Sequence, residues 1–153
     1  MPGFDPQPRK GYLKTQKQVH GRHLFGVFPA QYPKEILWAF HILPVEIWDP
    51  PLEITSANAH LQPYICSVVK LGLELILQGK CEDMDGFLFP HTCDSIQNLA
   101  SIVHDFLGLG KPCYFFYHPA DGLDGHGSIR QVHKRFSFEV ELEYLFIRRN
   151  KNR

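Results

Sequence analysis

Neither sign of charge is in excess in this sequence, because sixteen lysines and arginines balance sixteen aspartates and glutamates. A surface of this kind lacks the positive field that attracts nucleic acid or an anionic membrane. Long apolar runs are also missing: the stretch 71–77 is interrupted by Gly72 and Glu74, and it falls well short of the roughly 20 residues that span a bilayer. We therefore expect neither nucleic acid nor a membrane as a partner.

Several motifs that carry well-defined chemistry are absent as well. The chain has no GxSxG, no GxxxxGK[ST] and no HExxH, which argues against a serine-hydrolase elbow, a nucleotide P-loop and the common zinc sites. Its first residues lack the apolar stretch of a secretory signal, so we expect a cytoplasmic protein. In that compartment the four cysteines are reduced thiols or metal ligands rather than a disulfide framework.

The residues that are present predict one globular domain of the α/β class. Hydrophobic residues make up 44% of the 153 residues, which is enough for a packed core. Between residues 23 and 119, four short apolar runs alternate with three helical patterns, in the order β-α-β-α-β-α-β. This alternation is typical of a Rossmann-like parallel sheet with helices on both faces. The expected strands are 24–28, 45–48, 86–89 and 113–117, and the expected helices begin at Pro33, close to Pro63 and at Asp94.

Both ends of the chain differ from this central lobe. Residues 1–22 hold several prolines and basic residues but few aliphatic ones, which predicts a flexible leader. Residues 120–153 form an atypical, irregular tail, in which a glycine-rich stretch precedes a strongly basic end. The apolar run 140–147 in this tail fits either a strand or a short helix.

The four cysteines fall into two predicted pairs. Cys66 and Cys93 are expected beside helix N-termini at the carboxyl edge of the sheet, where open parallel sheets bind their ligands. There the unpaired N–H groups and the helix dipole stabilise a thiolate, which suits an iron–sulfur cluster. Cys81 and Cys113 are interpreted as buried core residues. No CxxC spacing joins Cys66 to Cys93, so the residues alone leave open whether these two are cluster ligands or small hydrophobes.

Three segments of the chain resemble one known family. GVFPAQYPKEILWAFHILPVEIW at 26–48, YICSVVK at 64–70 and DGFLFPHTCDSIQNL at 85–99 occur in the order and at the distances found in that family. It is the 2-hydroxyacyl-CoA dehydratase and benzoyl-CoA reductase family, which includes the D-component of 2-hydroxyglutaryl-CoA dehydratase. The resemblance covers about residues 23–118 and implies the N-terminal, cluster-binding lobe of an α/β subunit.

The resemblance implies a site and a set of partners. Cys66 and Cys93 would be two of three protein ligands of a 4Fe–4S cluster, and Ser67, His91 and Asp94 would orient or hydrogen-bond the sulfurs. The substrate would be an acyl-CoA, and a homologous second subunit would complete a heterodimer. A separate ATP-dependent iron–sulfur activator would deliver a single electron. The reaction would be the radical dehydration catalysed by a lyase-type enzyme, or the related reduction of an aryl-CoA ring.

The chain also departs from this family. Neither Cys81 nor Cys113 matches the third ligand, and the sequence after residue 119 does not continue as the resemblance predicts. This indicates a truncation, a frame shift or a natural fragment, and we expect the chain alone to be inactive. The alternative, from another class, is a non-catalytic α/β binding or assembly module without metal. A flavodoxin-like nucleotide or flavin binder is a third interpretation and rests on fold analogy alone.

Overall fold

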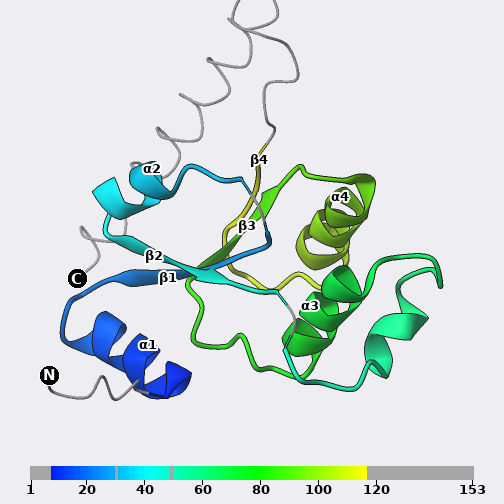
Figure 1. Ribbon diagram of the computed structural model, residues 1–153, viewed down its shortest axis with the longest axis horizontal. Coiled ribbons are helices and arrows are strands. Elements are labelled where there is room, and N and C mark those ends of the chain that lie inside the picture. The colour runs from blue at the N-terminus through cyan, green and yellow to red at the C-terminus, as the bar shows by residue number, and fades with distance from the viewer. Residues whose placement is uncertain (1–7, 30, 49, 117–153) are drawn as a thin grey trace, which may run out of the picture.

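The computed structural model describes residues 8–29, 31–48 and 50–116, and it confirms the α/β class (Figure 1). The predicted stretches after residue 119, including 140–147, lie outside these residues. None of the described helices is long and apolar enough to cross a membrane. The elements in chain order are α1 (Arg9–Gln18), β1 (His23–Val27), α2 (Lys34–Ala39), β2 (Ile42–Glu46), the 3₁₀ helix η1 (Ser56–Ala59), α3 (Ser67–Leu77), β3 (Gly86–Pro90), α4 (Asp94–Ser101), the π-helical turn η2 (Ile102–Phe106) and β4 (Cys113–Phe116).

The four strands form one parallel sheet in the order β2-β1-β3-β4. The chain leaves the inner strand β1 toward β2 on one side, and then returns to place β3 on the other side of β1. This reversal makes the carboxyl ends of β1 and β3 the switch point of the sheet, which is where the loops of such folds diverge and form a crevice.

Helices cover both faces of the sheet, as predicted (Figure 1). On one face, side chains of α3 and α4 pack with Phe28, Phe87 and Phe89 from the end of β1 and from β3. On the other face, Leu37 of α2 packs with a smaller buried group that includes Leu88. Because successive side chains of a strand point to opposite faces, Phe87 and Leu88 belong to different cores.

Gly72 determines how closely α3 approaches the sheet. A glycine inside a helix costs about 1 kcal/mol relative to alanine. Here a Cβ atom would overlap the ring of Phe28, which is completely buried. The glycine that interrupts the apolar stretch of the sequence is therefore a packing requirement of this helix.

The first helix, α1, was not predicted, because residues 1–22 were expected to form a flexible leader. Its sequence is mostly polar, so it has little apolar periodicity to reveal it. Several contacts attach it to the lobe: among them, Leu13 packs against the larger core, and the buried Gln16 accepts a hydrogen bond of 2.9 Å from Arg22. Residues 9–18 thus form regular structure, contrary to the expectation for this segment.

Two predicted boundaries were also wrong. The strand expected at 45–48 begins at Ile42, because His41 adopts a left-handed conformation (φ 56°) that ends the preceding helix. As a result, Leu43 lies in β2. The helix expected to begin close to Pro63 begins at Ser67, after the separate turn η1.

Candidate functional site

Cys66 and Cys93 occupy equivalent positions in the fold. Each is the residue immediately before a helix, Cys66 before α3 and Cys93 before α4, and neither side chain caps its helix. Both are free and exposed thiols. α4 follows the carboxyl end of β3 directly, whereas the C-terminus of α3 leads through residues 78–85 into the amino end of β3. The N-termini of both helices therefore face the carboxyl edge of the sheet (Figure 1).

The first turns of α3 and α4 make this edge electropositive. The carbonyl oxygen of Cys66 accepts the N–H of Lys70 at 3.2 Å, and that of Cys93 accepts the N–H groups of Ile96 and Gln97 at 3.1 and 3.4 Å. The N–H groups before these donors have no acceptor within their own helix. Together with the helix dipoles, they favour negative charge beside both thiols.

The loop that carries Cys93 is attached on both sides. The Thr92 hydroxyl donates to the carbonyl oxygen of Pro29 at 3.3 Å, which joins the loops after β3 and β1 at the switch point. On the other side, the main-chain N–H of His91 donates to the carbonyl oxygen of Phe116 in β4 at 2.7 Å. The His91 ring meets the Phe115 ring edge-on, with centroids 5.6 Å apart. His91 thus packs toward β4.

The other two residues predicted to contact the sulfurs, Ser67 and Asp94, are the first residues of α3 and α4, and both are exposed. Across residues 8–29, 31–48 and 50–116, no group of three or more histidines, cysteines, aspartates or glutamates is arranged to hold a metal ion. Thiolates are the ligands that iron–sulfur clusters take, so the chemistry of Cys66 and of Cys93 suits such a ligand.

Cys81 and Cys113 lie at the opposite, amino edge of the sheet. The prediction of a buried core residue is confirmed for Cys81, whereas Cys113 packs against the larger core without being fully buried. Cys81 is 7% exposed in the loop before β3, and Cys113 is half-buried at the start of β4. Burial raises the pKa of the Cys81 thiol to about 11 and has the same effect on Cys113. Both thiols are therefore neutral and poorly nucleophilic at neutral pH.

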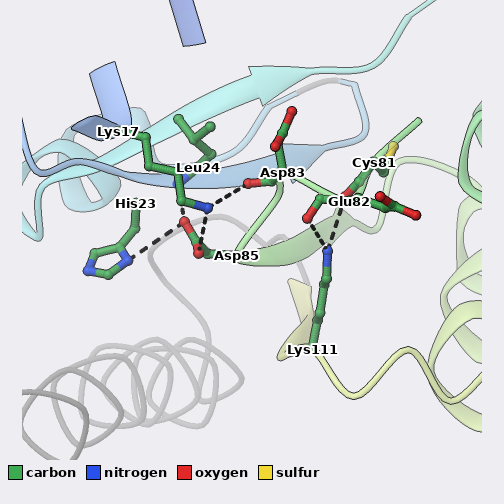
Figure 2. Close-up of polar contacts among 8 residues, drawn as sticks. All are labelled: Lys17, His23, Leu24, Cys81, Glu82, Asp83, Asp85 and Lys111. Atoms are coloured by element: carbon green, nitrogen blue, oxygen red, sulfur yellow. Dashed lines mark hydrogen bonds and ion pairs between the residues drawn. The ribbon is translucent and has the colours of Figure 1, made fainter. Parts of the chain in front are cut away.

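A network around Asp85, which the sequence did not reveal, fastens this amino edge (Figure 2). The Asp85 carboxylate accepts the main-chain N–H of Leu24 at 3.0 Å and the ammonium of Lys17 at 3.1 Å, and its Oδ2 lies 3.8 Å from Nδ1 of His23. Burial would raise the pKa of Asp85, but the hydrogen bonds from His23, Leu24 and Lys17 hold it well below its usual range. Lys17 also donates to the carbonyl oxygen of Asp83 at 2.9 Å, so the network ties α1 to β1 and to the loop before β3.

A second lysine stabilises the backbone around Cys81. The Lys111 ammonium donates to the carbonyl oxygens of Cys81 and Glu82 at 3.2 and 2.7 Å (Figure 2). These contacts join the approach to β4 to the approach to β3, and they orient the Cys81 backbone without exposing its thiol. The amino edge is thus built for rigidity.

A third polar cluster, also missed from the sequence, surrounds Glu46 at the carboxyl end of β2. Its carboxylate accepts hydrogen bonds from Lys34 at 2.8 Å, Trp48 at 2.9 Å and the Tyr32 hydroxyl at 2.6 Å. The bonds from Lys34, Trp48 and Tyr32 lower the pKa of Glu46 to about 2, and burial together with Glu46 raises the pKa of Tyr32. This cluster fixes the loop after β1 against β2, beside the switch point.

Comparison with known proteins gives one consistent family. The sequence profile of the family described as 2-hydroxyglutaryl-CoA dehydratase, D-component, matches residues 29–146. The match continues past residue 118, so the resemblance extends further along the chain than the three motifs indicated.

Three curated relatives agree with that profile. The chain is 29% identical over 90 residues to the (R)-phenyllactyl-CoA dehydratase beta subunit of Clostridium sporogenes, covering 59% of this chain and 24% of the relative. It is 35% identical over 83 residues to a benzoyl-CoA reductase subunit of Thauera aromatica, covering 53% and 22%. It is 23% identical over 133 residues to the (R)-2-hydroxyglutaryl-CoA dehydratase subunit beta of Acidaminococcus fermentans, covering 86% and 33%. The chain thus spans between about a quarter and a third of the relatives' length.

Proposed function

This chain belongs to the 2-hydroxyglutaryl-CoA dehydratase D-component family, and we propose that it is the lobe of a 2-hydroxyacyl-CoA dehydratase-type subunit that binds an iron–sulfur cluster through Cys66 and Cys93. One observation carries the proposal: of the four cysteines, the two exposed ones precede helices at the carboxyl edge of the sheet, and the other two are sequestered at the amino edge.

Each residue of the site has a defined role in this proposal. Cys66 and Cys93 bind as thiolates, and the free N–H groups of the first turns of α3 and α4 stabilise the negative charge of the ligated group. The Ser67 hydroxyl donates to a sulfur, and His91 and Asp94 fix the orientation of the Cys93 loop. The two thiols occupy two positions of the 4Fe–4S cluster and leave the others to further ligands.

The rest of the proposal follows from the family. A bound cluster of this type would supply one electron to the thioester of an acyl-CoA, and loss of the 2-hydroxyl group or reduction of an aromatic ring would follow. Two of the relatives are named as beta subunits of dehydratases and the third as a subunit of benzoyl-CoA reductase, which supports a second subunit as a partner. We propose that this second subunit is homologous to the first. An ATP-dependent activator is proposed as the electron donor.

The test is iron and acid-labile sulfide analysis of the 153-residue chain, purified without oxygen. We expect substantial iron and sulfide and a brown colour in the unmodified chain. Cys66→Ala or Cys93→Ala should remove most of the iron, because each thiolate is a direct ligand. The matched control is Cys113→Ala, which deletes a cysteine from the opposite edge of the sheet and should keep the metal.

The alternative function, a metal-free binding or assembly module, predicts a different result. A colourless and stable protein, with the same background iron in all four versions, would contradict cluster binding by this chain and support the module. Equal loss of iron in Cys113→Ala would contradict the assignment of the ligands.

A further inference from the structure

Glu74, in the middle of α3, is a completely buried carboxylate that the proposed site does not use (0% exposed). Within the described part of the chain, no lysine, arginine or histidine forms an ion pair with it. Taking an unpaired carboxylate out of water is strongly unfavourable. A buried charge of this kind requires strong hydrogen-bond donors around it.

Four donors meet this carboxylate. Oε2 accepts the main-chain N–H groups of Thr55 at 3.1 Å and Ala57 at 2.8 Å. Oε1 accepts the Thr55 hydroxyl at 2.9 Å and the Gln78 side-chain amide at 2.9 Å. The hydrogen bond from Ala57 outweighs burial and, with those from Gln78 and Thr55, lowers the pKa of Glu74 to about 2. The side chain is therefore ionised at neutral pH.

Three of these bonds, those from Thr55 and Ala57, join two elements that lie on either side of Cys66 in the sequence. Thr55 precedes η1 and Ala57 lies within it, whereas Glu74 belongs to the helix that Cys66 immediately precedes. The carboxylate takes the place of an N-terminal cap for η1. Residues 60–66 thus form the loop that connects η1, which contacts Glu74, to the first turn of the same helix.

Two further contacts hold this loop against α3. Leu61 and Ile65 are each 7% exposed and belong to the larger core. The Lys70 ammonium donates to the carbonyl oxygen of Pro63 at 2.9 Å. The Glu74 carboxylate fixes the end of the loop that is farther from Cys66, where the loop leaves η1. None of the hydrogen bonds of Glu74 involves the loop that carries Cys93.

We propose that Glu74 is the positioning residue for Cys66: its buried carboxylate holds η1 against α3, and the loop between them presents the thiol at the start of the helix. Cys66 needs a fixed position only if it is a cluster ligand, so this part of the inference rests on the proposed function. The effect of the Glu74 carboxylate on the loop before Cys66 can be tested without metal.

The test compares the metal-free 153-residue chain with Glu74→Gln, which keeps the size of the side chain but loses the charge. The alkylation rates of Cys66 and Cys93 by iodoacetamide are measured in the same sample by mass spectrometry, together with amide hydrogen exchange. Loss of a charge-assisted bond is expected to speed exchange at Thr55 and Ala57 about tenfold, and to change the Cys66-to-Cys93 rate ratio. The matched control is Glu53→Gln, an exposed glutamate in the same segment, which should change neither.

Thr55→Val provides a milder variant if Glu74→Gln does not fold, because it deletes one of the four donors. Thr55→Ser keeps the hydroxyl and should restore both the rate ratio and the exchange rates. A folded Glu74→Gln or Thr55→Val protein with an unchanged ratio and unchanged exchange would overturn the positioning role. If Glu74→Gln changes the Cys66-to-Cys93 rate ratio but the unmodified chain never binds iron, the positioning role of Glu74 stands and the proposed cluster is refuted.

Discussion

The two edges of the sheet use the same residue types in opposite ways. At the carboxyl edge, Cys66 and Cys93 are exposed thiols beside helix N-termini. At the amino edge, Cys81 and Cys113 are withdrawn from solvent, and burial raises the pKa of each to about 11. The amino edge uses Asp85, Lys17 and Lys111 in internal bonds. The carboxyl edge has one such cluster, around Glu46, but leaves its two thiols exposed. Environment, more than residue type, therefore identifies the cysteines suited to bind a ligand.

The same contrast extends to the aspartates. Asp85, at the amino edge, has a side chain only 10% exposed and accepts bonds from two main elements of the lobe. Asp94, at the carboxyl edge, is exposed in the first turn of α4. One carboxylate stabilises the fold, and the other is available to the surroundings of Cys93.

Differential alkylation should produce the largest difference between the edges. At pH 8, a thiol with a pKa of about 11 is ionised in about one molecule in a thousand. We expect Cys66 and Cys93 to react with iodoacetamide at least about 100-fold faster than Cys81 and Cys113 in the folded chain. Peptide mass spectrometry gives the four rates, and unfolding in urea should bring them together. If the four cysteines of the folded chain reacted at similar rates, the proposed difference in thiol reactivity between the two edges of the sheet would be wrong.

Asp85→Asn should give the next largest effect. An asparagine leaves the Lys17 ammonium and the Leu24 N–H with a weaker, neutral partner, so the free energy of unfolding should fall by about 2 kcal/mol. The matched change at the other edge, Asp94→Asn, should cost no more than about 0.5 kcal/mol, the value of one exposed charge at a helix N-terminus. Urea denaturation measures both. If Asp85→Asn and Asp94→Asn lowered the free energy of unfolding equally, the network around Asp85 would not be a special source of stability at the amino edge.

Mild acid should give the smallest effect. The pKa values of Glu46 and Glu74 are about 2 in the folded chain and 4.5 in the reference state, so the unfolded chain binds more protons as the pH falls below about 5. Their contribution to stability is complete above that pH and is lost progressively toward pH 2. The urea midpoint should fall modestly from pH 7 to pH 4, and less in a Glu46→Gln variant. If the urea midpoint of the Glu46→Gln variant fell with pH as steeply as that of the unmodified chain, Glu46 would not contribute to the pH dependence of stability.

Local patterns predicted the strand order along the chain and the positions of the two exposed cysteines. Cys93 precedes a helix, as expected. Such features depend on neighbouring residues, which is why one sequence suffices to indicate them. The distance between the two sulfurs depends on tertiary packing and is not fixed by any local spacing.

The missed features depend on long-range or unusual contacts. Asp85 meets Leu24 and Lys17 across 61 and 68 residues of sequence, and no local periodicity records such a pairing. Glu74 interrupts an apolar helical stretch, and a charged residue there is normally expected on the solvent face, although its partners bury it. His41 ends a helix through a positive φ, which is uncommon for residues other than glycine. In each case the tertiary contacts overrode the local preference.

Protection from alkylation tests most directly whether Cys66 and Cys93 bind one cluster. The chain is incubated with ferrous iron and sulfide without oxygen, freed of excess reagents and treated with iodoacetamide. We expect Cys66 and Cys93 both to lose their reactivity, and chelation of the iron to restore it. Two thiols that alkylate at their metal-free rates after this treatment would contradict a shared cluster.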